Sequence, residues 1–129
     1  MKIEEHKHYF LVNGIKVHWN FKLLPSNFLA ITLFGHIFTT LTKDQLKQYL
    51  HTSWGEILVN HERIHILQAK SFKLGYFSFY LYYLMFYLFG ICKYNNTNMA
   101  YYQIPFEQEA YNSETDFGYS ETRWKDYNI

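Results

Sequence analysis

Short apolar runs rich in β-forming residues fill the first third of the chain. Residues 8–20 hold two such runs separated by Asn13-Gly14, a pair that accepts the positive φ angles of a tight hairpin turn. A third apolar run, from Phe28 to Phe38, is short and β-branched, which favours one more strand added to this hairpin. The pattern therefore predicts a small antiparallel sheet over residues 1–40.

The middle of the chain carries two signals for the start of a helix. Thr42 and Ser53 are each followed, three positions later, by a side chain that can cap the helix start reciprocally. The second of these helices is expected to run from about 54 to 74, where Gly75 is a natural stop. Two consecutive helices are therefore expected after the sheet.

The last third of the chain begins with a turn-rich break at 95–98. Pro105 then suits the first turn of a final helix over about 105–117, because proline has no amide hydrogen to lose there. Together these patterns predict a single α+β domain over 1–129. Its parts are the sheet at 1–40, helices at 42–93, and a final helix with its tail at 99–129.

Residues 74–92 form an uncharged, aromatic stretch bracketed by Lys73 and Lys93. Its length reaches the threshold for crossing a bilayer, but two stripes at helical spacing give it an amphipathic pattern. The first stripe carries hydroxyl groups: Tyr76, Tyr80, Tyr83 and Tyr87. The second is apolar: Phe77, Leu81, Leu84 and Leu88. We expect a helix packed on its predecessor, with the tyrosines toward water, a groove or a lipid headgroup layer.

Composition limits the classes of function. A net charge of +1, from 12 basic and 11 acidic side chains, leaves no basic stripe for a phosphate backbone, so nucleic acid is not an expected partner. Cys92 is the single cysteine, which excludes an internal disulfide and a thiolate zinc site. The charged N-terminus does not resemble a secretory signal. A cytoplasmic location is expected, with membrane association through 74–92 as an alternative.

The sequence NHERIH, residues 60–65, places two histidines four positions apart. On a helix, His61 and His65 would share one face and could bind a single metal ion. Glu62 is rotated about 100° from His61, so its carboxylate would lie beside the metal and could take a proton from an attacking water. A surface helix with solvated side chains is the alternative explanation of this short motif.

NHERIH followed by PFEQEAY resembles the gluzincins, zinc peptidases that take a third ligand from a glutamate on a later helix. The pair of motifs is also similar to short zincin-like proteins of Bacteroidetes. The resemblance implies a zincin-like fold, a zinc cofactor, Glu107 as the third ligand and a peptide or protein as substrate. In one gluzincin branch the second motif is E-x-x-A-D, and here Tyr111 stands in place of the aspartate that would orient a zinc histidine.

Several other polar residues are candidates for supporting roles. Glu109 lies about 200° around the helix from Glu107, so both cannot face one metal. Gln68, one turn beyond His65, could steady a ligand or a substrate carbonyl, or lie on the surface as an ordinary amide. The residues whose type suits oxyanion stabilisation are His36, Tyr101 and Tyr102.

These observations favour a zinc metallopeptidase in which Glu62 acts as general base. The alternative is a non-catalytic protein that keeps the zincin fold and serves a zinc-binding or membrane-associated interaction role.

Overall fold

The structure is a computed structural model that describes residues 1–23 and 28–129. It contains strands and helices in the α+β arrangement that the sequence predicted. The strands are β1 (Ile3–Glu5), β2 (Phe10–Val12), β3 (Ile15–His18), β4 (Ala30–Leu33) and β5 (His36–Thr39). The helices are α1 (Lys43–Leu50), α2 (Ser53–Lys70), α3 (Tyr76–Tyr94), α4 (Thr97–Tyr102), α5 (Pro105–Ser113) and the short 3-10 helix Trp124–Asp126.

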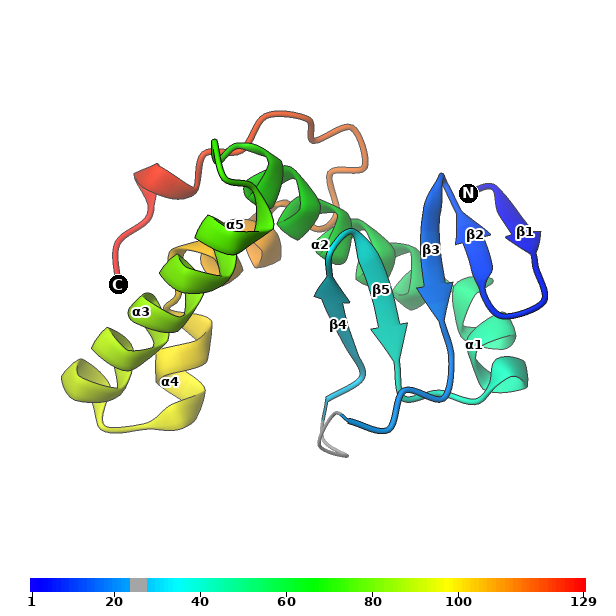
Figure 1. The fold of residues 1–129 in the computed structure, drawn as a ribbon, viewed down its shortest axis with the longest axis horizontal. Coiled ribbons are helices and arrows are strands. Elements are labelled where there is room, and N and C mark those ends of the chain that lie inside the picture. The colour runs from blue at the N-terminus through cyan, green and yellow to red at the C-terminus, as the bar shows by residue number, and fades with distance from the viewer. Residues whose placement is uncertain (24–27) are drawn as a thin grey trace. The chain divides into compact units, whose positions relative to one another are not determined.

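The chain divides into two compact units, Met1–Arg63 and Ile64–Ile129. The boundary falls inside α2, so one continuous helix contributes residues to both units. The first unit contains the sheet and α1, and the second contains α3, α4 and α5 (Figure 1). That the whole chain forms a single domain stays a prediction.

The five strands form one sheet in the order β1-β2-β3-β5-β4 (Figure 1). The predicted hairpin is confirmed: β2 and β3 are antiparallel, and both Asn13 and Gly14 have positive φ angles, 50° and 84°. The expectation of a purely antiparallel sheet is wrong, because β5 lies parallel to β3. The strand β1, which has two glutamates among its three residues, was not predicted from its charged sequence and pairs with β2 at the sheet edge.

The apolar run from Phe28 to Phe38 does not form the one strand that was expected. It turns at Phe34 and Gly35, which both adopt positive φ angles, 52° and 84°, and its two halves pair as the antiparallel strands β4 and β5. Positive φ angles at both positions are typical of a tight hairpin turn. A phenylalanine at the first position is not a sequence signal for such a turn. The result places β4 at the edge of the sheet.

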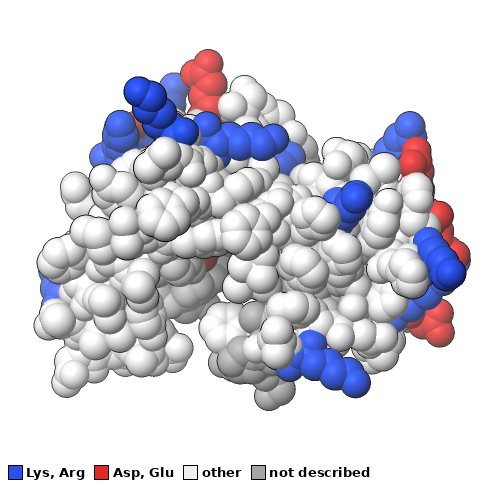
Figure 2. Space-filling model, viewed as in Figure 1, with Lys and Arg blue, Asp and Glu red and all other residues white. Residues whose placement is uncertain are grey.

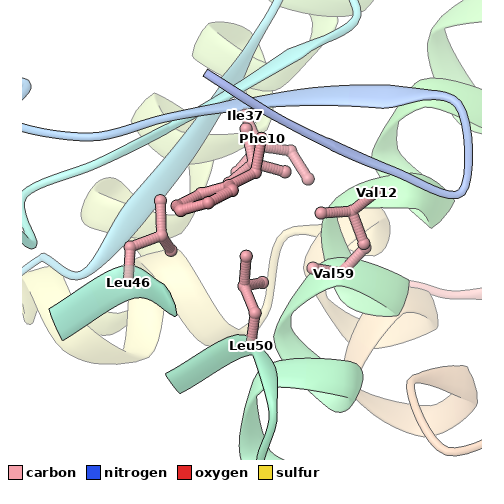
Figure 3. Close-up of a cluster of buried hydrophobic side chains, with 7 residues drawn as sticks. Phe10, Val12, Ile37, Leu46, Leu50 and Val59 are labelled. Atoms are coloured by element: carbon pink, nitrogen blue, oxygen red, sulfur yellow. The ribbon is translucent and has the colours of Figure 1, made fainter. Parts of the chain in front are cut away.

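Alternate residues of the strands and one face of α1 build the core of the first unit (Figure 3). Its buried members are Phe10, Val12, Val17, Ile37, Leu46, Leu50 and Val59. The period of two along a strand and of about four along a helix brings these positions to one side of each element. Val59 comes from α2, so this core fixes the first half of the helix that carries the histidine motif.

Capping residues define where α1 and α2 begin. Thr42 caps α1 in a reciprocal capping box with Gln45, as the sequence predicted. At α2 the amide of Gly55 donates to the hydroxyl of Thr52 over 3.1 Å, so Thr52 acts as the cap in place of the predicted Ser53. The helix ends at Lys70, four residues before the predicted end.

The tyrosine stripe of α3 does not lie open to water, which was one of the orientations expected for it. The tyrosine stripe packs inward on the core of the second unit, which is built around Ala69, Phe79, Ile104 and Phe106. Every member of the apolar stripe is exposed: Phe77, Leu81, Leu84 and Leu88. The predicted packing of this helix beside α2 is present, since the rings of Phe79 and His65 lie 6.0 Å apart. Among the described residues, no helix combines the length and apolar character needed to cross a membrane.

The segment after α3 is more helical than its turn-rich sequence suggested. Asn95 ends α3 in the left-handed conformation with a φ of 51°, which asparagine tolerates well. The side chain of Asn96 then accepts a hydrogen bond from the amide of Met99 and caps α4, a helix that was not predicted. The last helix, α5, has Pro105 in its first turn as expected but ends at Ser113 rather than 117.

Close approach of α1 and α2 gives a test of the fold of the first unit. A Cβ atom at Gly55 would overlap the carbonyl oxygen of Tyr49 and lie 2.8 Å from the Cα atom of Leu50. Because backbone must move to relieve that clash, Gly55→Ala should lower the free energy of unfolding by roughly 3 kcal/mol in urea denaturation. The control is Gly118→Ala, whose new methyl group would come no closer than 3.7 Å to Asp116. Equal losses in the two variants would contradict the close approach of these helices.

Candidate metal centre

Three buried side chains converge at the motif that the sequence singled out. His61 and His65 project from α2, and Glu107 projects from α5. Each offers a ligand atom, and these atoms all lie within 4.8 Å of one another. In the described part of the chain this is the one group of three or more histidine, cysteine or carboxylate side chains placed to hold a metal ion.

His65 is held by hydrogen-bonding atoms on both sides of its ring. Its Nδ1 atom lies 2.8 Å from Oε1 of Gln68, and its Nε2 atom lies 3.1 Å from Oε1 of Glu107. The ring is buried, with 6% of its surface exposed, so these contacts rather than water determine its tautomer.

The orientation of the Gln68 amide decides which nitrogen of His65 carries the proton. The amide nitrogen donates to the carbonyl oxygen of Phe106 over 2.9 Å and to the carboxylate of Glu109 over 2.7 Å. Both partners can only accept, so the amide group must face them and its oxygen must face His65. Nδ1 of His65 is therefore a donor, and in the neutral ring Nε2 presents a lone pair.

That lone pair faces a carboxylate oxygen of Glu107 at 3.1 Å. A nitrogen lone pair and a carboxylate oxygen at this distance repel each other unless a proton or a metal cation lies between them. Two histidines and one glutamate are a known ligand set for catalytic zinc, with metal–ligand bonds of about 2.0–2.2 Å. The chemistry of the donor set therefore fits zinc.

Tyr83 on α3 orients Glu107, the third candidate ligand. Its hydroxyl donates to Oε2 of Glu107 over 2.6 Å. This bond occupies one carboxylate oxygen and leaves Oε1 directed at His65. The sequence placed Tyr83 in a stripe but carried no signal for this role, because the contact spans 24 positions between two helices.

Glu109 anchors the hydrogen-bond network that positions His65. Its side chain is fully buried and accepts a hydrogen bond from Gln68. Three more donors come from the C-terminal segment: the hydroxyl of Tyr119 at 2.5 Å, the hydroxyl of Thr122 at 2.6 Å, and the backbone amide of Arg123. Burial, reinforced by Glu109, raises the pKa of Tyr119 to about 12, so this hydroxyl stays protonated as a donor at physiological pH.

These contacts orient His65 through Gln68, where the resemblance to gluzincins would have placed an orienting aspartate at position 111. The orienting atom is Oε1 of Gln68, and Glu109 fixes the amide in turn. Gln68 and Glu109 were both named from the sequence as candidates for support, but their connection was not. The contribution of Tyr119 and Thr122 was missed, since nothing in a polar tail marks which hydroxyls meet a buried carboxylate.

Glu62, the expected general base, is buried and held by the sheet. The hydroxyl of Thr32 on β4 donates to Oε2 of Glu62 over 2.6 Å. This bond limits the rotation of the carboxylate. Its second oxygen, Oε1, can still act as an acceptor. Thr32 was not a candidate from the sequence, because its contact with Glu62 spans 30 positions between a strand and a helix.

The tyrosines proposed for oxyanion stabilisation, Tyr101 and Tyr102, both pack beside Tyr111 in the second unit. The hydroxyls of Tyr101 and Tyr111 lie 3.3 Å apart, and the ring of Tyr102 packs 5.4 Å from that of Tyr111. Burial raises the pKa of Tyr111 to about 12, and the nearby charge of Glu107 acts in the same direction. Tyr111 thus stays neutral near the glutamate ligand.

His36, the remaining candidate for an oxyanion donor, makes its ring contacts on the sheet. Its Nδ1 atom lies 2.9 Å from Nε2 of His18, and the two rings stack. Its role in stabilising an oxyanion stays a prediction from residue type alone.

Comparisons with protein-family models, with curated proteins and with solved structures give no match for this chain. The resemblance to gluzincins therefore stays a prediction that depends on the residues of the two motifs.

The network makes a direct prediction for metal affinity. Gln68→Leu should weaken zinc binding by about 10–100-fold, because His65 loses the acceptor that fixes its tautomer and ring orientation. The measurement is a chelator competition titration, supported by the visible spectrum of the cobalt-substituted protein. Gln108→Leu is the matched control: this amide also donates two hydrogen bonds, to the carbonyl oxygens of Gln103 and Asn128, but it is hydrogen-bonded to none of the three candidate ligands. Equal zinc affinity in both variants would contradict the network.

Proposed function

We propose that this protein is a zinc-dependent metallopeptidase with a zincin-like fold. The observation that carries the proposal is the buried convergence of His61, His65 and Glu107, with the lone pair of His65 aimed at the carboxylate. In this proposal α2 is the active-site helix and α5 supplies the glutamate ligand. The substrate would be a peptide or a protein.

The chain's own residues would share the work as follows. His61, His65 and Glu107 hold the metal, and Gln68 and Tyr83 keep two of these ligands in position. Zinc, when bound, supplies a Lewis acid that polarises a carbonyl group and acidifies a water molecule.

Glu62 would move the protons. It follows His61 directly on α2, so it is rotated about 100° from that ligand and lies beside the metal rather than on it. Its carboxylate would take a proton from the attacking water and pass it to the leaving amine. Thr32 holds one oxygen of Glu62, which limits the rotation of the carboxylate during these two transfers.

A structural zinc site is the second candidate, and the burial of the site favours it. His61, His65 and Glu107 each expose 6% of their surface or less. A metal enclosed in this way could tie α2 to α5 without turning over a substrate. The two candidates differ in what a change at Glu62 does, because a purely structural metal has no use for a proton acceptor beside it.

Metal content tests the ligand set. The purified protein should contain about one zinc per chain, and His61→Ala or His65→Ala should abolish binding, because two ligands cannot complete the site. Glu107→Ala should have the same effect, whereas Glu109→Gln, which keeps the side-chain shape, should weaken binding by only about tenfold. Elemental analysis measures the zinc content of each variant, and chelator competition measures its zinc affinity. Full zinc content in either histidine variant would contradict the site.

Glu62→Gln separates catalysis from structure. The amide cannot accept a proton, so this variant should keep its zinc and lose at least about 100-fold in the rate of peptide cleavage. The assay uses a mixture of fluorescence-quenched peptides, with Glu56→Gln on the first turn of α2 as the control. A zinc-loaded wild-type protein that cleaves no peptide would favour the structural site, and equal cleavage by Glu62→Gln would contradict the role of this residue.

A further inference from the structure

An exposed apolar row runs along α3. Its residues follow one another at helical spacing, and each leaves a large part of its surface in contact with solvent. They are Phe77 at 69%, Leu81 at 49%, Leu84 at 54%, Met85 at 41% and Leu88 at 52%. Large apolar patches of this kind are uncommon on proteins that act alone in water and mark interaction surfaces.

The row cannot turn inward, because the opposite side of α3 is already committed. The tyrosines pack on the second core, and Tyr83 is hydrogen-bonded to Glu107. α3 is also fixed against α4: a Cβ atom at Gly90 would lie 2.9 Å from the Cα atom of Ala100. α4 adds the exposed side chains of Met99 and Tyr102. The apolar surface therefore belongs to a closely packed pair of helices.

The charged side chains of the segment that carries this surface have one sign. Residues 64–106 contain no aspartate or glutamate, and their charged side chains are Lys70, Lys73 and Lys93. All three lysines are exposed, and they lie before α3 and in its last turn. Figure 2 shows the result as an uncharged surface over α3 and α4.

We propose that the exposed face of α3 and α4 docks on the surface of an anionic lipid membrane, with α3 lying in the headgroup layer. An apolar face rimmed by lysines suits this location, since the side chains enter the acyl boundary and the lysines meet lipid phosphates. Tyrosine and methionine at the edges suit an environment that is apolar on one side and wet on the other.

Cys92 allows the test to be made on the unmodified sequence. It is the single cysteine, it is exposed, and it lies one turn after Leu88 on the same side of α3. A polarity-sensitive fluorophore on Cys92 should shift its emission to the blue when vesicles of phosphatidylcholine and phosphatidylglycerol are added. Vesicles of phosphatidylcholine alone should give a smaller shift, and salt should reduce binding to the anionic vesicles.

Vesicle flotation with variants identifies the face. The double variant Leu81→Gln with Leu88→Gln should lower the bound fraction by roughly fivefold or more, since it removes apolar area without changing charge. The double variant Lys70→Gln with Lys73→Gln should weaken binding to the anionic vesicles but leave binding to phosphatidylcholine vesicles unchanged. Trp54→Ser, at a side chain that is 70% exposed in the first unit, should bind as the wild type does. Circular dichroism checks that each variant is folded.

Three results would overturn the proposal. The first is a wild-type protein that stays unbound with an unshifted Cys92 probe at every lipid composition. The second is equal vesicle binding by wild type and the leucine variant, which would place the contact elsewhere. The third is a dimer, seen by light scattering, that the leucine variant dissociates while vesicles bind neither form, which would assign the face to a second copy. The proposal does not depend on the metal site, so these results leave the proposed peptidase activity untouched.

Discussion

A buried carboxylate, Glu109, is the constraint on which the arrangement of the second unit depends. An ionised carboxylate in a protein interior costs several kcal/mol unless its oxygens are hydrogen-bonded. Here four donors meet it, and a hydrogen bond to a charged group contributes about 1.5–3 kcal/mol. Three of these donors lie in the C-terminal segment, so the tail is held in place by the same charge that orients Gln68.

The consequence reaches the proposed metal ligands through one amide. Gln68 can satisfy Glu109 and the carbonyl oxygen of Phe106 only with its nitrogen, which leaves its oxygen for His65. The tautomer of His65 is thus determined by a glutamate that never contacts the ring. A buried polar network of this kind is stable only when each of its groups is hydrogen-bonded. This requirement explains why the C-terminal tail, which has no strands or long helices, is held at Thr122.

The sequence predicted what depends on local pattern and missed what depends on contacts between distant segments. The capping box at Thr42, the hairpin at Asn13-Gly14 and the helical face shared by His61 and His65 each follow from residues within five positions of one another. The parallel pairing of β3 and β5 does not, because strand order is decided by how two hairpins pack on a common core. In the candidate site, the contacts of Tyr83 and of Thr32 span 24 and 30 positions, beyond the reach of spacing rules.

The inward orientation of the tyrosine stripe of α3 has a physical explanation in the same site. Tyrosine side chains usually face water more readily than leucine side chains, because a buried tyrosine hydroxyl needs a hydrogen-bond partner. In this protein a buried acceptor is present: Glu107 accepts a hydrogen bond from the hydroxyl of Tyr83, and the ring of Tyr83 packs on Phe79 and Phe106. Once the tyrosines are turned inward, the helix has no position left for its leucines except the outside. The exposed apolar face therefore follows from the way the Glu107 carboxylate is held by Tyr83.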